Sequence, residues 1–190
     1  MTHLFDEFSL RGVTLRNRIG VSPMCQYVAE DGMASDWHLV HLGARAAGGA
    51  GLVMVEATGV VPEGRITPGC LGLWTDDQVE PLARIVRFMR DQGAVPALQL
   101  GHAGRKASSD QPWVGGDYLL AEGGGWEIVG PSPVPFHDKA PVPRELTPDD
   151  IAEIQEAFRA AARRAIAAGF DWLEVHAAHG YLMHSFHSPI

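Results

Sequence analysis

Two histidines and a tyrosine lie close together near the end of the printed sequence. His176, His179 and Tyr181 follow an apolar run of strand length, Phe170 to Val175, and Gly180 precedes the tyrosine. Imidazole N–H groups three residues apart can both donate to one oxygen and stabilise the negative charge of a developing enolate. A phenol two residues further on can deliver a proton to the carbon next to the carbonyl group of that enolate. The cluster predicts a site that polarises a carbonyl and protonates its substrate.

Three more apolar runs end in segments that carry polar or sulfur-containing side chains: Ser22 to Tyr27, Glu56 to Gly59, and Gln99 to Lys106. Cys25, Tyr27 and Gln99 are the side chains in these segments that could do chemistry, and an amide such as that of Gln99 is the kind of group that orients a flat heterocycle. Each also has a simpler interpretation, as a small buried residue, a filler at the core edge and a rim residue respectively. The ordered occurrence of four such segments favours the functional interpretation.

Strands and helices must position these motifs. Continuous apolar runs predict a short hairpin over Leu4 to Arg18 and strands at Ile19 to Met24, Gly51 to Thr58, Val95 to Leu100 and Asp171 to His176. Apolar residues at helical spacing predict helices at Asp36 to Ala47, Asp76 to Gln92 and Pro148 to Ala168. This alternation predicts an α/β fold with a parallel sheet. In a (β/α)8 barrel the four motifs would share the catalytic rim.

The segment 105–145 interrupts the alternation of strands and helices. It contains six prolines, one pair of glycines and one run of three glycines, which exclude regular helix or central strand over most of its length. Connections this long inside one domain are usually functional lids or binding loops, although a tolerated surface insertion is the alternative. Because it follows the third predicted strand, it would lie on the same rim as the histidines.

Composition limits the classes of function. The chain has 190 residues, is 46% hydrophobic and carries a net charge of −8, so it can bury one core and is a poor partner for nucleic acid or anionic membranes. We find no apolar run long enough to cross a membrane and no signal-peptide order at the N-terminus, which predicts a cytoplasmic protein. Cys25 and Cys70 are the two cysteines, and both are expected to be reduced.

Together the four motifs resemble the flavin-dependent ene-reductases of the Old Yellow Enzyme family. The spacing of Cys25 and Tyr27 resembles the thermophilic-like subclass, which includes the xenobiotic reductases. The resemblance extends over essentially the whole chain and includes Asp36-Trp37-His38 and Pro62 to Thr67. It implies a (β/α)8 barrel of which this chain supplies the N-terminal hairpin and about four βα units, as a single partial barrel domain over residues 1–190.

The resemblance also implies the cofactors and the role of each residue. FMN would supply hydride, NADPH or NADH would be the reductant, and an α,β-unsaturated carbonyl compound (an enone) would be the substrate. His176 and His179 would bind the carbonyl, Tyr181 would donate the proton, and Tyr27 would add a hydrogen bond to the substrate. The flavin contacts implied by the family are Ser22, Pro23, Met24, Cys25, Ala57 and Gln99, with Cys25 tuning the flavin potential.

Four histidines at intervals of three, five and three raise the alternative of a metal-dependent barrel hydrolase or lyase. His184 and His187 complete this run. A bound zinc or other transition metal usually has additional ligands, and the sequence offers no nearby Asp, Glu or Cys to complete the set. Glu174 shares one strand face with His176 and could support it. We therefore expect no metal, and we expect His187 to be a surface residue.

The resemblance covers half of a barrel, which raises a further alternative. The family holds its flavin phosphate on loops after strands seven and eight, which have no counterpart in these residues. The outer strands of a four-stranded sheet have open edges that favour association. We therefore expect a homo-oligomer or pairing with a complementary half-barrel, and a non-catalytic, self-associating half-barrel is the alternative to an enzyme.

Overall fold

The computed structural model describes residues 1–189 as one parallel sheet covered by helices. The strand order is β3 (Gly20–Val21), β4 (Leu52–Gly59), β5 (Val95–Gly101) and β8 (Trp172–Val175). Every neighbouring pair is parallel, and the spatial order follows the sequence. This is the topology of consecutive βα units in a (β/α)8 barrel. The predicted α/β class and parallel sheet are confirmed.

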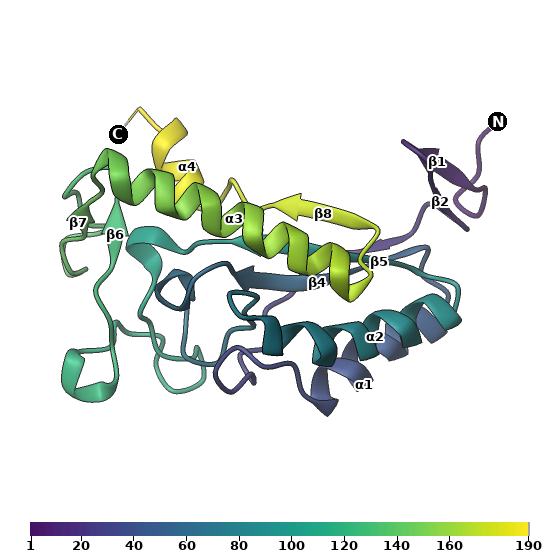
Figure 1. Ribbon diagram of the computed structural model, residues 1–190, viewed down its shortest axis with the longest axis horizontal. Coiled ribbons are helices and arrows are strands. Elements are labelled where there is room, and N and C mark those ends of the chain that lie inside the picture. Colours follow the sequence, from purple (N-terminus) through teal and green to yellow (C-terminus); the bar gives the residue numbers. More distant parts are fainter. Residues whose placement is uncertain (190) are drawn as a thin grey trace.

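Three helices lie side by side along the outer face of the sheet (Figure 1). They are α1 (Asp36–Ala47), α2 (Val79–Asp91) and α3 (Pro148–Ala168), and the 3-10 turn η2 (Asp76–Gln78) leads into α2. The main core joins Val53 and Val55 of β4 to Leu82, Ile85 and other residues on the apolar stripe of α2. The bounds predicted for α1 and α3 are those observed.

On each strand, every second side chain points to the inner face of the sheet, opposite the helices. Leu52, Met54 and Ala97 form a second buried cluster there with Leu15 of the N-terminal hairpin. The hairpin pairs β1 (Phe8–Leu10) with β2 (Val13–Leu15) antiparallel, which confirms its prediction. It lies at the amino ends of the strands, opposite the rim that carries the motifs (Figure 1).

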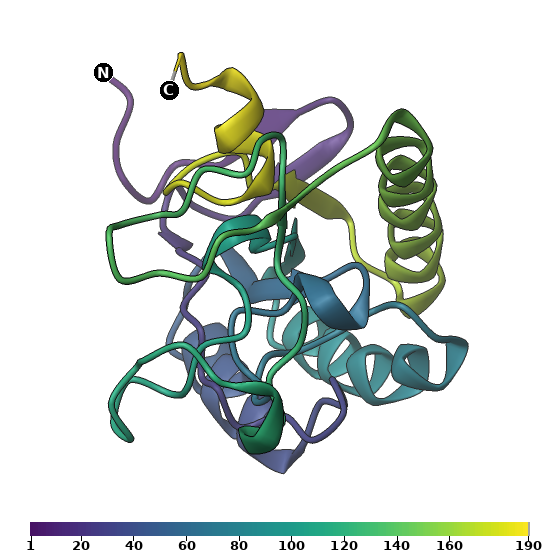
Figure 2. The same cartoon turned by 90° about the vertical axis from the view of Figure 1, so that its left-hand side faces the viewer.

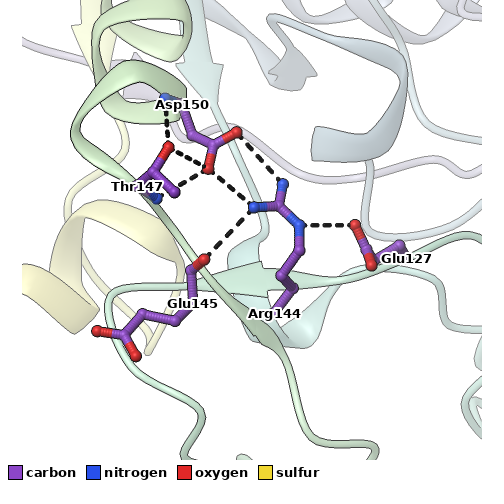
Figure 3. Close-up of polar contacts among 5 residues, drawn as sticks. All are labelled: Glu127, Arg144, Glu145, Thr147 and Asp150. Carbon is purple, nitrogen blue, oxygen red and sulfur yellow. Dashed lines mark hydrogen bonds and ion pairs between the residues drawn. The ribbon is translucent and has the colours of Figure 1, made fainter.

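The N-terminus of α3 is fixed by the cap that the sequence predicts. The Thr147 hydroxyl accepts from the Asp150 amide at 3.2 Å, and Asp150 Oδ2 accepts from the Thr147 amide at 2.8 Å. Arg144 joins this cap to the long loop, because its guanidinium contacts both Asp150 and Glu127 at 2.8 Å (Figure 3). The Arg144 bond lowers the pKa of Asp150 well below its usual range. At the other end of α3, Gly169 adopts φ +97° as a C-cap.

The segment 105–145 has little regular structure, as predicted. It contains the end of η3 (Gly104–Lys106), the turn η4 (Ala121–Gly123) and two short strands, β6 (Val129–Gly130) and β7 (Arg144–Glu145), that pair in parallel. Figure 2 views the molecule from the end at which this segment and α4 (Leu182–His187) lie. With the turn η1 (Pro62–Gly64), they cover the carboxyl ends of the strands.

The helix predicted at Asp76 to Gln92 is divided into η2 and α2, and β4, β5 and β8 differ from their predicted bounds by one residue at one or both ends. Two differences are larger. The first strand was predicted over Ile19 to Met24, but β3 ends at Val21, because Pro23 has no amide to donate and the Gln26 amide bonds the Glu56 side chain instead of a ladder. The helix α4 was not predicted, since its six residues are too few to show a helical period. No helix among residues 1–189 has the length and apolarity of a membrane span.

Candidate active site

The rings of His176, His179 and Tyr181 meet at the carboxyl end of β8. The His176 ring centroid lies 5.1 Å from that of His179 and 4.8 Å from that of Tyr181, and both pairs are close to perpendicular. The His176 amide donates to Leu100 O at 2.8 Å, so the residue is tied to the neighbouring strand β5. The predicted cluster is therefore brought together by the fold.

The orientation of His176 is defined by its own backbone. Its Nδ1 accepts from the Ala178 amide at 3.3 Å. A neutral imidazole has one donor and one acceptor nitrogen, so the proton lies on Nε2 and is free to be donated to a ligand. Burial, followed by the neighbouring His179, lowers the pKa of His176. The ring is therefore neutral over a wider pH range and acts as a hydrogen-bond donor through Nε2.

The turn after β8 is strained and is held by two side chains. His179 has φ +59°, a left-handed conformation that is uncommon for non-glycine residues, and Gly180 follows with φ +75°. Lys106 Nζ donates to His179 O at 2.9 Å, and His184 Nδ1 accepts from the Gly180 amide at 2.6 Å. Lys106, the last residue of the motif that follows β5, lies inside the cluster, with its Nζ 5.0 Å from the Tyr181 ring centroid.

The thiol of Cys25 and the phenols of Tyr27 and Tyr181 are the groups near the histidines that could lose a proton. Burial, followed by the nearby Cys70 and Glu56, raises the pKa of Cys25 to about 12. Burial, Cys25 and Cys70 raise the pKa of Tyr181 to about 12, and burial and Cys25 raise that of Tyr27. All three groups keep their protons at neutral pH. Tyr181 can therefore donate a proton, whereas Cys25 is a poor nucleophile.

The inner face of the sheet offers amide groups that a flavin would need. Gln99 is buried, and its Nε2 donates to Glu174 Oε1 at 2.5 Å, which leaves the Gln99 carbonyl oxygen as an acceptor. The β4–β5 ladder has a bulge between Val55 and Thr58, so the backbone of Ala57 is released from regular pairing. An acceptor side chain beside a released backbone fits the hydrogen-bonding edge of an isoalloxazine.

The remaining predicted flavin residues lie on the loop after β3. Ser22 and Met24 are exposed and Pro23 is half-buried, so this backbone can be reached by a ligand on the rim. Tyr27 has φ +54° and its ring centroid lies 6.1 Å from that of Trp113. Trp113 comes from the long segment 105–145 and was not predicted as a site residue.

Two cavities border the cluster. One has about 10 Å³, room for about one water, and lies between Ile66, Cys70, His176 and Tyr181. The other has about 220 Å³ and is lined by Tyr27 and Lys106 together with Tyr118, Phe136 and other residues of segment 105–145. The long segment therefore forms one wall of the space next to the predicted substrate-binding tyrosine.

The four histidines do not converge. His184 is bonded to the Gly180 amide, and His187 is exposed on α4. No group of three or more His, Cys, Asp or Glu side chains within residues 1–189 has the arrangement of a metal site. The half-buried Glu174 accepts a hydrogen bond from Gln99, and its charge acts on the pKa of His176 in the direction opposite to burial.

Comparison with known proteins identifies the family of the chain. Residues 3–190 match the sequence profile of the NADH:flavin oxidoreductase / NADH oxidase family. The chain is 51% identical over 193 residues to NADH:flavin oxidoreductase FG08077 of Gibberella zeae, covering 100% of this chain and 47% of that protein. It is 46% identical over 191 residues to an NADPH dehydrogenase of Geobacillus thermodenitrificans, covering 100% of this chain and 52% of that protein.

Solved structures give the same result. The structure of the Old Yellow Enzyme homologue from Zymomonas mobilis superposes with a TM-score of 0.80 at 32% identity, covering 95% of this chain and 50% of that one. The chain thus spans about half the length of the relatives it matches. The expected pairing of a flavin with a nicotinamide nucleotide is that of the matched family. The chain belongs to the NADH:flavin oxidoreductase / NADH oxidase family, and its fold is the first half of the (β/α)8 barrel of Old Yellow Enzyme.

Proposed function

We propose that the protein containing this chain reduces the C=C bond of α,β-unsaturated carbonyl compounds, using FMN and either NADPH or NADH. The observation that carries this proposal is the convergence of two imidazoles and a phenol at the end of β8. Bound FMN supplies hydride chemistry. The side chains of this chain then have to polarise the acceptor and provide a proton.

His176 and His179 bind the carbonyl oxygen in this proposal. The Nε2–H of His176 is available because its Nδ1 is occupied by the Ala178 amide. Two such donors stabilise the negative charge on the oxygen more in the transition state than in the ground state, which is the requirement for rate acceleration. Burial of His176 strengthens the interaction, because little water competes for the same donor.

Tyr181 donates the proton to the α-carbon. Its phenol stays protonated at neutral pH because burial raises its pKa to about 12. The Lys106 ammonium, 5.0 Å from the ring centroid, favours the phenolate that forms when the proton leaves. Tyr27, across the rim, adds a hydrogen bond to the substrate, and the neighbouring 220 Å³ cavity accommodates the part of the substrate beyond the carbonyl.

The flavin would be held by the loop after β3 and the inner strand ends. The backbone around Ser22, Pro23 and Met24 and the released backbone of Ala57 provide main-chain contacts, and the Gln99 carbonyl accepts a hydrogen bond. The Cys25 thiol would contact the isoalloxazine and tune its potential while staying protonated, since burial raises its pKa to about 12. A homo-oligomer or a complementary half-barrel would supply the contacts to the flavin phosphate.

The decisive test is binding of a phenol, which mimics the enolate oxygen, in a completed barrel. For this we define the completed barrel as residues 1–190 joined to the C-terminal half of the Geobacillus thermodenitrificans relative. In the His176→Ala, His179→Ala double variant, the long-wavelength charge-transfer band between phenol and flavin is expected to disappear. His187→Ala, which changes an exposed histidine on α4, is the control and should keep the band. A double variant that retains both the band and enone reduction contradicts the assignment.

A further inference from the structure

Gln26, between the predicted flavin-tuning thiol and the substrate tyrosine, is held at three points. Its amide donates to Glu56 Oε2 at 2.9 Å, and its side-chain Oε1 accepts from Trp37 Nε1 at 3.0 Å. Its Nε2 donates to Met24 O at 2.8 Å. Tyr27, the next residue, has the left-handed φ of +54°. Such a conformation persists in a tyrosine only when its surroundings enforce it.

The opposite side of the segment is confined as well. A Cβ atom added to Gly69 would overlap the Tyr27 carbonyl group. The Ala29 amide donates to Gly69 O at 2.9 Å, so the backbone beyond Tyr27 is attached to the same glycine. The segment Cys25–Tyr27 is therefore clamped between Gly69 on one side and Glu56 on the other.

Glu56 is itself part of a buried pair. The whole residue is 3% exposed and His38, at the third position of α1, is 1% exposed. His38 Nε2 lies 3.3 Å from Glu56 Oε1, within ion-pair distance but without hydrogen-bond geometry, and neither atom has a hydrogen-bond partner within residues 1–189. His38 Nδ1 accepts from the Ser35 amide at 3.0 Å. An imidazole that accepts at Nδ1 carries its proton on Nε2, so His38 presents a donor to Glu56.

We propose that His38 and Glu56 are positioning residues whose contact fixes the Cys25–Tyr27 segment and thereby places its thiol and phenol at the active site. The catalytic consequence rests on the proposed function, whereas the structural relationship does not. Glu56 accepts one hydrogen bond, from the Gln26 amide, and its other oxygen faces the buried His38 Nε2–H at 3.3 Å; a carboxylate is the side chain that presents an acceptor to both donors. The pair connects the start of α1 through β4 to the loop after β3, three elements that are separate in sequence.

The neutral amide of Glu56→Gln cannot replace the carboxylate. One of its two terminal atoms is an NH₂ group, which would face either the Gln26 N–H or the His38 Nε2–H, so one buried donor would meet another donor. Moving the His38 proton to Nδ1 would break the bond that Nδ1 accepts from the Ser35 amide and leave the Ser35 hydroxyl, at 3.0 Å, as the remaining partner of that nitrogen. The variant should therefore release one of the two contacts without changing the volume of the side chain.

The first measurement uses the unmodified 190-residue chain without flavin. Hydrogen exchange resolved to single amides should show Gln26 exchanging at least about tenfold more slowly than Cys25 and Tyr27, because a bond to a buried carboxylate protects it. The flanking amides of Cys25 and Tyr27 donate no hydrogen bond within residues 1–189 and serve as internal controls. Nitrogen NMR should find His38 as the Nε2–H tautomer. Equal exchange of the three amides, or a His38 Nδ1–H tautomer, overturns the proposal.

The second measurement compares the pH dependence of Cys25 alkylation in the unmodified chain and in Glu56→Gln. The groups that act on the Cys25 thiol are Cys70, Glu56, Tyr27 and the nearby Tyr181. Removing the Glu56 charge should move the alkylation midpoint of Cys25 to lower pH and raise its rate about tenfold at a fixed alkaline pH. Cys70 is 1% exposed and reports on general unfolding in the same sample.

Asp36→Asn is the matched control. It removes a carboxylate at the start of α1, the end that carries His38, but from an exposed side chain that pairs with Arg84. It should leave the Cys25 midpoint unchanged. A folded Glu56→Gln chain whose Cys25 profile equals that of Asp36→Asn contradicts the proposal. If Cys70 is labelled equally fast, the variant has unfolded and the exchange measurement on the unmodified chain decides. Because no flavin is present in either experiment, both results are independent of whether the completed protein reduces enones.

Discussion

The ammonium of Lys106 donates a hydrogen bond to the main-chain oxygen of His179 at 2.9 Å. The two residues come from different strand ends, since Lys106 follows β5 and His179 follows β8. The bond lies where the backbone is strained, because His179 has φ +59°. Lys106 therefore fixes the turn that sets the direction of both the His179 imidazole and the Tyr181 phenol.

Lys106→Met should weaken this turn while keeping much of the apolar contact of the lysine stem. The loss of one charge-assisted hydrogen bond at a partly exposed position should lower the free energy of unfolding by about 1 kcal/mol, measured by urea denaturation. In the completed barrel, phenol binding should weaken several-fold. Lys139→Met, which alters an exposed lysine of the long segment, is the control. Equal effects of the two substitutions would show that Lys106 does not support the turn.

Acid sensitivity should depend on His102. Burial lowers the pKa of His102 from 6.5 to about 4. The unfolded chain therefore binds a proton at higher pH than the folded chain, so the stabilising contribution is complete above pH 6.5 and is lost as the pH falls toward 4. Between about pH 7 and pH 5, the unmodified chain should lose about 2 kcal/mol from this one group.

The substitution that checks this is His102→Asn, because its side-chain oxygen can still accept the Gly104 amide that now bonds His102 Nδ1 at 3.0 Å. The variant should be less stable than the unmodified chain near neutral pH but should lose less stability on acidification, measured by urea denaturation at both pH values. Burial also lowers the pKa of His176, so part of the pH dependence of the unfolding free energy should remain in the variant. An unchanged pH slope would show that His102 is not the main acid-sensitive group.

Cys25→Ser should shift the flavin reduction potential of the completed barrel and leave measurable turnover. Burial raises the pKa of the Cys25 thiol to about 12, so at neutral pH the group acts on a flavin as a polarisable, uncharged neighbour. A tuning contact changes the driving force of the reaction and not its path. The potential is measured by reductive titration, and turnover with an enone is measured in the same preparation. Normal FMN binding with complete loss of turnover would instead assign chemistry to the thiol.

Much of the fold is predictable because its signals are local. The bounds of α1 and α3 follow from helical spacing and from caps such as Thr147 and Gly169, whose side-chain and backbone properties act within a few residues. The strands β4 and β5 follow from continuous apolar runs. The early end of β3 has one local signal, Pro23, but the path of the chain beyond it is not predictable in this way, because the Gln26 amide donates to Glu56, thirty residues further along.

The site is predictable where its residues belong to one motif. His176, His179 and Tyr181 lie together because they follow one strand, and their spacing is visible in the sequence. Lys106 and Trp113 reach the site through tertiary contacts that no spacing encodes. The His38–Glu56 contact likewise joins a helix start to a strand end, so only the fold reveals it.

A polypeptide of residues 1–190 should associate and should bind FMN weakly by itself. The outer strands of its sheet are β3 and β8, and Val175 at the end of β8 is 49% exposed. An apolar groove of about 240 Å³ between α3 and α4 is lined by Ile151, Phe158, Leu182, Phe186 and other residues. Open strand edges and exposed apolar surface favour pairing with a second copy or with a complementary half-barrel.

The proposed FMN contacts would engage the isoalloxazine edge, whereas barrels of this type commonly hold the phosphate on loops after strands seven and eight. Sedimentation with and without FMN, together with calorimetric titration, measures both properties. We expect a dimer or larger species, and FMN affinity that increases strongly when a complementary half-barrel is added. A monomer that binds FMN with submicromolar affinity would contradict both parts of this prediction, and it would mean that the strand ends described here hold the cofactor without phosphate contacts from elsewhere.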